Sequence, residues 1–249
     1  MSTMPETTEM ENSGPLIILI TDTGRIDDGT FNQYAYEGLK QVLQTHTARL
    51  EVVQTESPTD YENNVRSAAA QGADYIVTVG SRAGAAVERL AGRYSRTHFI
   101  IVDYEPLPES RNVTGLVFAE DQAAFLAGAL AGLMTDSDVV GFVGGMDVTP
   151  VRKFQRGFEH GVAHVNRRAS VETRETGSFT DRDAGESAAA ELIAAGCDVI
   201  FAAGGQSGSA AIRAAAQQGV WVIGVDPVSY THLRAHETSL HLVCRLLLE

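Results

Sequence analysis

Residues 72–80 read GADYIVTVG, and residues 196–204 read GCDVIFAAG. Each segment begins with a glycine, continues through a short apolar run, and leaves it through a second glycine. A second pair, HFIIVD at 98–103 and WVIGVD at 221–226, repeats an apolar strand that ends in aspartate. Recurrence of the same two patterns in the same order predicts two similar halves within one chain.

Apolar runs and amphipathic segments alternate along the chain between these repeats. Strands are expected at 15–20, 50–54, 75–79, 98–102, 113–118, 139–143, 171–176, 199–202 and 221–225, and helices at 32–45, 60–71, 83–94, 123–134, 150–166, 183–195 and 207–218. Strands that alternate with helices of this length are typical of βαβ units. The pattern predicts an α/β protein with two Rossmann-like lobes, each built on a parallel sheet, at 15–117 and 118–226.

The composition excludes several classes of protein. The 249 residues are 44% hydrophobic and 20% charged, which is ordinary globular usage, and the net charge is −13. So acidic a surface repels nucleic acid. No apolar run reaches the length of a membrane-spanning helix. Cys197 and Cys244 form no metal-binding spacing, and no glycine-rich phosphate-binding motif occurs. We expect neither a metal nor a cofactor.

The two ends of the chain differ from its middle. Residues 1–14, MSTMPETTEMENSG, are expected to form a flexible linker, either the disordered start of a cytosolic protein or the tether behind a removed export signal. Residues 227–249, rich in histidine and leucine towards their end, are expected to be a non-native or disordered tail.

Ligands of open α/β sheets bind beyond the carboxyl ends of the strands. The residues expected there are Asp22, Phe31, Asn32, Asp103, Phe179, Gly205 and Asp226. Aromatic faces can sandwich a planar ring, and carboxylates and amides can bind ring nitrogens and sugar hydroxyls. Five of these residues also have a structural interpretation: the three aspartates and the glycine as turn residues, and Phe31 as a hydrophobic staple of the next helix.

Catalytic groups are poorly represented at these strand ends. Ser81 and Ser207 lie there, but neither is framed by a GxSxG elbow, and no base–nucleophile pair is evident. We therefore expect a binding protein that carries out no chemistry.

Five segments together resemble the basic membrane protein family of substrate-binding proteins, of the purine nucleoside receptor type. They are DTGRIDDGTFNQ at 22–33, FAEDQAAFLAG at 118–128, VGFVGGMD at 140–147, FQRGFEHG at 154–161 and VWVIGVD at 220–226. The resemblance implies a type I periplasmic-binding fold whose two lobes close on a nucleoside and deliver it to the permease subunits of an ABC importer. It also implies that the protein is located on the outer face of the plasma membrane or in the periplasm.

The resemblance also implies roles for individual residues. Phe31 and Phe179 would stack on the base, and Asn32 and Asp103 would read its edge. The base or the ribose would be contacted by Asp22, Gly205 and Asp226. No segment of this sequence matches the family's lysine near the ribose, its C-terminal return segment that completes both sheets, or its lipidated cysteine that anchors members to the membrane, so we expect the sequence to be C-terminally truncated. The alternative is a cytosolic ligand-sensing regulatory protein that uses the same fold.

Overall fold

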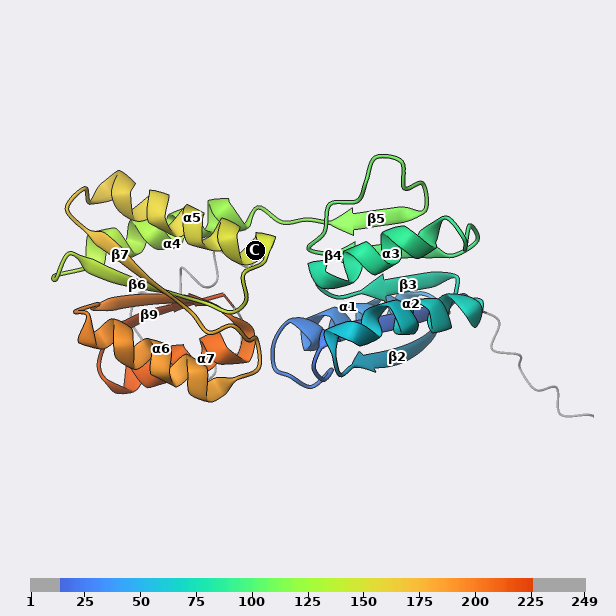
Figure 1. The fold of residues 1–249 in the computed structure, drawn as a ribbon, viewed down its shortest axis with the longest axis horizontal. Coiled ribbons are helices and arrows are strands. Elements are labelled where there is room, and N and C mark those ends of the chain that lie inside the picture. The colour runs from blue at the N-terminus through green and yellow to red at the C-terminus, as the bar shows by residue number, and fades with distance from the viewer. Residues whose placement is uncertain (1–13, 226–249) are drawn as a thin grey trace, which may run out of the picture. The chain divides into compact units, whose positions relative to one another are not determined.

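Strands and helices alternate throughout residues 14–225, the part of the chain that the computed structural model describes (Figure 1). The elements are β1 (Leu16–Thr23), α1 (Phe31–Thr45), β2 (Arg49–Thr55), the 3-10 turn η1 (Pro58–Asp60), α2 (Tyr61–Ala70), β3 (Tyr75–Thr78), the 3-10 turn η2 (Ser81–Ala83), α3 (Gly84–Ala91), β4 (His98–Val102), β5 (Val113–Leu116), α4 (Glu120–Met134), β6 (Val139–Gly144), α5 (Thr149–Val165), β7 (Ser170–Glu175), α6 (Arg182–Ala194), β8 (Val199–Ala203), α7 (Gly205–Gln217) and β9 (Trp221–Gly224).

The described residues group by their contacts into two compact units. Unit 1 contains residues 14–26 and 32–117, and unit 2 contains residues 27–31 and 118–225. Unit 1 has a parallel sheet in the order β2-β1-β3-β4-β5, and unit 2 has one in the order β7-β6-β8-β9. The repeated segments of the sequence form β3 and β8, then β4 and β9, at equivalent positions of the two sheets. The predicted α/β architecture with two similar parallel sheets is confirmed.

The strand β1 in the sheet of unit 1 is buried on both faces. Alternate residues of β1 point to opposite sides, so that Ile18 and Ile20 join the core beneath α2 and α3. Ile17 and Leu19 join a second core beneath α1. A strand buried on both sides needs a continuous apolar run, which is why β1 shows no polar alternation.

The sheet of unit 2 lies between two helical layers, with α4 and α5 on one face and α6 and α7 on the other (Figure 1). Glycines bring α4 and α5 into backbone contact. A Cβ added to Gly161 would lie 2.0 Å from the Phe125 carbonyl oxygen, and one added to Gly128 would lie 2.1 Å from the Phe158 carbonyl oxygen. Any larger residue at these positions would push the two helices apart.

The expected boundaries were wrong by up to three residues. β5 ends at Leu116 instead of 118, and α7 begins at Gly205 instead of 207. The three largest differences have local causes. α3 ends at Ala91 instead of 94, because the Asn112 side chain donates to the carbonyls of Ala91 and Tyr94 and so stabilises a turn. α4 begins at Glu120 instead of 123. The buried carboxylate of Glu120 forms an ion pair with Lys153, with 3.0 Å between Oε2 and Nζ. β1 continues to Thr23 because β2 pairs with it as far as Thr55.

Several expectations fall on residues 1–13 and 226–249, which lie outside the described residues: most of the linker, the tail and Asp226. Among residues 14–225, no helix combines the length and apolar character that crossing a membrane requires. The same range contains no cluster of three or more histidine, cysteine or acidic side chains arranged to hold a metal ion.

Candidate functional site

The carboxyl edge of the unit 1 sheet brings three strand ends into one row. β1, β3 and β4 are paired in register through Ile20, Thr78 and Ile101. Two residues beyond these positions, the three strands lead to Asp22, Gly80 and Asp103, respectively. The two carboxylates that the sequence predicted for this site in unit 1 therefore follow the same row of the sheet, with a glycine between them.

A bulge in β1 sets the position of Asp22. The pairing with β2 advances three residues on β1, from Ile20 to Thr23, but only two on β2. Thr55 secures the irregularity, because its amide donates to Thr21 Oγ1 at 2.9 Å and its hydroxyl donates to the Thr21 carbonyl at 2.7 Å. An extra residue in one strand bends the chain locally and re-aims the side chains that follow it.

Asn32 also holds this strand end. Its side chain is buried, and Asn32 Oδ1 accepts a hydrogen bond from the Asp22 amide at 2.8 Å. The preceding residue, Phe31, is the first of α1 and is 36% exposed. The structure therefore gives the two neighbours different surroundings: the amide of Asn32 braces β1, while the Phe31 ring has a large exposed surface.

The Asp22 carboxylate lies in a polar cluster contributed by three elements. Asp22 Oδ1 accepts hydrogen bonds from Arg82 Nη2 at 2.6 Å, Arg82 Nε at 3.2 Å and the Thr23 amide at 2.7 Å. Tyr61, the first residue of α2, donates its hydroxyl to the same oxygen. The side chains of Asp22 and Arg82 are only 14% and 17% exposed, so this ion pair is screened less than a surface pair.

Tyr61 and Arg82 also contact each other. The Arg82 guanidinium lies 5.7 Å from the centre of the Tyr61 ring, and Arg82 Nη2 donates to Thr23 Oγ1 at 2.8 Å. Burial, with the neighbouring Asp22 charge, raises the pKa of Tyr61 to about 12. The phenol is therefore protonated at neutral pH and acts as a hydrogen-bond donor to Asp22.

Asp103 has a backbone conformation that few residues adopt. Its φ is +61°, and its amide donates to the Leu116 carbonyl at 2.8 Å. Aspartate tolerates the left-handed region better than most side chains, but such residues remain uncommon and concentrate at functional sites. This strand end is thus held in a specific bent geometry directly beyond β4.

In unit 2, the loop that carries Phe179 packs on the start of α7. The Phe179 carbonyl accepts the Gln206 amide at 2.8 Å, and Ser207 Oγ donates to the Ser178 carbonyl at 2.7 Å. Gly205 has a φ of +58°, and a Cβ there would come within 3.0 Å of the Phe179 carbonyl oxygen. The glycine thus permits the loop to cap the helix, and the helix in turn holds Phe179.

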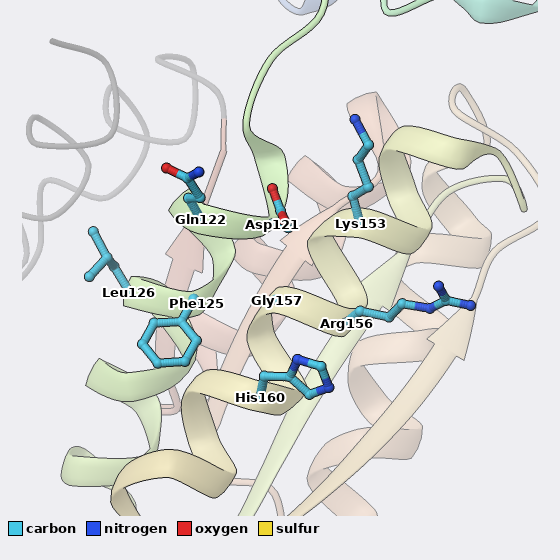
Figure 2. Close-up of a pocket in the computed structure, with 8 residues that line it drawn as sticks. All are labelled: Asp121, Gln122, Phe125, Leu126, Lys153, Arg156, Gly157 and His160. Carbon is cyan, nitrogen blue, oxygen red and sulfur yellow. The ribbon is translucent and has the colours of Figure 1, made fainter.

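A separate pocket of about 630 Å³ lies on the helical face of unit 2, between α4 and α5 (Figure 2). Its lining consists of Asp121, Gln122, Phe125, Leu126, Lys153, Arg156, Gly157 and His160. Figure 2 shows Lys153, Arg156 and His160 along α5, with Gln122, Phe125 and Leu126 across from them on α4. None of the predicted ligand-binding residues lines this pocket, so it is distinct from the strand ends.

The sequence analysis missed Tyr61 and Arg82. From the sequence, Tyr61 is only part of an expected helix, and Arg82 follows a strand end without a recognisable motif. The one available signal was the place of Arg82 two residues after the glycine that ends the strand at 75–79. Among the predicted residues, the structure brings Asp22 and Asn32 together in unit 1, and Phe179 and Gly205 together in unit 2.

Comparison with known proteins identifies the family. The family described as "ABC transporter substrate-binding protein PnrA-like" matches residues 16–234, most of the chain. The chain belongs to this family. The membership inferred from the sequence motifs is therefore confirmed.

Curated relatives support the assignment to the PnrA-like family. A CD4+ T-cell-stimulating antigen of Listeria monocytogenes is 33% identical over 222 residues, which cover 84% of this chain and 62% of that protein. The ABC transporter nucleoside-binding protein BmpA of Lactococcus lactis is 30% identical over 220 residues, with the same coverages, 84% and 62%. The chain thus spans about 62% of the length of these relatives.

A solved structure supports the fold of this PnrA-like chain. An ABC transporter solute-binding protein from Aeropyrum pernix matches with a TM-score of 0.78 at 22% identity, covering 94% of this chain and 71% of that one. At this identity the likeness concerns the fold alone. It confirms the predicted type I periplasmic-binding fold.

Proposed function

We propose that this protein binds a purine nucleoside and passes it, chemically unchanged, to the permease subunits of an ABC importer. Family membership supports the general role of a substrate-binding protein. The name of the Lactococcus lactis relative supports nucleosides as the ligand class. The proposal places the protein on the outer face of the plasma membrane or in the periplasm, where a substrate-binding protein meets its solute.

The observation that carries the nucleoside proposal is the pair of strand-end carboxylates in unit 1, together with the exposed ring of Phe31. Two carboxylates, Asp22 and Asp103, follow one row of the sheet, and the exposed ring of Phe31 begins the helix that follows β1. Carboxylates accept hydrogen bonds from ring N–H groups and sugar hydroxyls, and an exposed aromatic face stacks on a planar base. Both features suit a nucleoside better than an apolar solute.

A second aromatic ring, that of Phe179, has little freedom to move. Phe179 packs partly against the core of unit 2, and its loop is tied to α7. The amide of Gln206 at the start of α7 is already bonded to the Phe179 carbonyl. A helix start with a donor already occupied is a poor phosphate site. The occupied start of α7 therefore favours nucleosides over nucleotides as ligands.

Calorimetry with a ligand panel tests the proposal. We expect guanosine, inosine or adenosine to bind, and cytidine and guanosine monophosphate to bind at least about 10-fold more weakly, a difference of about 1.4 kcal/mol. After incubation, chromatography should recover the nucleoside intact. Failure of every purine nucleoside to bind would contradict the ligand class, and release of free base would contradict the absence of chemistry.

A further inference from the structure

The two oxygens of the Asp22 carboxylate have unequal surroundings. Oδ1 accepts from Tyr61, from the Thr23 amide and from two nitrogens of Arg82. Oδ2 takes no hydrogen bond from any residue in the described range. It lies above Gly80, at 2.7 Å from the position that a Cβ on that glycine would occupy. One oxygen is thus fully engaged, while a glycine leaves space around the other.

We propose that Arg82 and Tyr61 are positioning residues for ligand binding, which hold Asp22 by Oδ1 so that Oδ2 alone accepts a hydrogen bond from the ligand. The inference rests on the proposed nucleoside-binding function. It adds Arg82 and Tyr61 to the residues on which nucleoside affinity depends. Neither residue is proposed to touch the ligand. Each acts through Asp22.

The geometry restricts the carboxylate in two ways. Arg82 approaches from η2 and Tyr61 from α2, so their donors reach Oδ1 from separate elements. Rotation of the carboxylate would break both contacts at once, and each is a charge-assisted hydrogen bond. The cation–π contact between Arg82 and Tyr61 further holds the two donors together. A binding group fixed in advance loses less conformational entropy when the ligand arrives.

Gly80 leaves the second oxygen of Asp22, Oδ2, without a covering side chain. Its φ of +84° favours glycine, and a side chain there would meet Asp22 Oδ2 directly. The strand end after β3 therefore keeps the acceptor oxygen uncovered, while the arginine two residues later holds the opposite oxygen.

A double-mutant cycle on ligand affinity tests the inference. Dissociation constants for the best-binding purine nucleoside would be measured with the wild-type chain, Arg82→Met, Asp22→Asn and the double variant. If Arg82 acts through Asp22, we expect Arg82→Met to weaken binding roughly 10-fold or more beside Asp22, and less than about threefold beside the asparagine. A purely structural role for Arg82 would give the same factor in both backgrounds and would overturn the inference.

Two milder variants and a control complete the design. Tyr61→Phe should weaken binding by roughly 3- to 10-fold beside Asp22 and little in the Asp22→Asn background. Arg82→Lys should restore part of the affinity lost in Arg82→Met, and it serves in place of that variant if Arg82→Met does not fold. Arg89→Met removes an exposed ion pair with Glu62 and should leave affinity unchanged. A wild-type chain that binds no nucleoside overturns the proposed function as well, whereas binding with no coupling overturns this inference alone.

Discussion

The Phe179 ring lies so close to Gly145 that a Cβ added to the glycine would stand 2.4 Å from two ring carbons. Gly145 follows β6, and Phe179 lies in the loop after β7, so the contact joins two neighbouring strand ends of unit 2. The same added Cβ would lie 3.1 Å from the Cα of Gly204, after β8. Small residues at these strand ends thus create the place that the aromatic ring occupies.

Gly145→Ala should displace Phe179 and weaken nucleoside binding by roughly 10-fold, because one stacked ring contributes about 1–3 kcal/mol. Calorimetry on the folded variant measures the loss. Gly38→Ala is the matched control, since Gly38 lies on α1 with nothing within 4 Å of an added Cβ. Unchanged affinity in Gly145→Ala would show that Phe179 does not contribute to binding.

Phe31→Ala should weaken nucleoside binding with little effect on stability, because the side chain is 36% exposed and loses few core contacts. The expected loss is again about 1–3 kcal/mol. Phe125→Ala provides the comparison, because that ring packs 5.5 Å from His164 between α4 and α5 and should act through stability instead. Equal affinities of Phe31→Ala and wild type would remove Phe31 from the proposed site.

Gly161→Ala should destabilise unit 2 by at least about 2 kcal/mol, because overpacking a tight seam forces the backbone to move. Its Cβ would lie 2.0 Å from the Phe125 carbonyl oxygen and 2.8 Å from the Ala129 amide nitrogen. Urea unfolding measures the change. Gly38→Ala, in an open helix position, should instead raise the free energy of unfolding by up to about 1 kcal/mol. A neutral Gly161→Ala would mean that α4 and α5 separate without cost.

Asp198 should stabilise the fold at neutral pH and lose this effect in acid. Although burial acts in the opposite direction, hydrogen bonds from the Thr135 hydroxyl and the Ser137 and Asp136 amides hold the pKa of Asp198 below its ordinary value. A lowered pKa in the folded state means that the stabilisation is present above the unfolded value of about 3.9 and disappears as the pH falls through the folded value.

Asp198→Ala should therefore lower the free energy of unfolding by about 1–2 kcal/mol at pH 7, with a smaller difference at pH 3. Urea titrations at the two pH values provide the test. Glu186→Ala, at an exposed position on α6, should change stability little at either pH. A difference for Asp198→Ala that grows in acid would contradict the assigned sign.

Local sequence determined the secondary structure and the repeat of this protein. A continuous apolar run such as LIILI at 16–20 can be buried only as a strand covered on both faces, and glycines at 72 and 196 end helices because they adopt positive φ. The order of these elements restricts a parallel sheet to few topologies. The candidate binding residues followed from their places after the strands, and four of them, Asp22, Phe31, Asn32 and Asp226, also lie within the family-like segments.

Tertiary structure alone decided the surroundings of Asp22. Tyr61 and Arg82 stand 39 and 60 positions from it, and nothing in their own segments marks them as its partners. They meet because β1, α2 and η2 converge at one sheet edge and because a bulge, fixed by the Thr21–Thr55 hydrogen bonds, turns Asp22 towards them. Sequence periodicity reports which face of an element is apolar, whereas side-chain contacts depend on register and local bending, which only the packed chain defines.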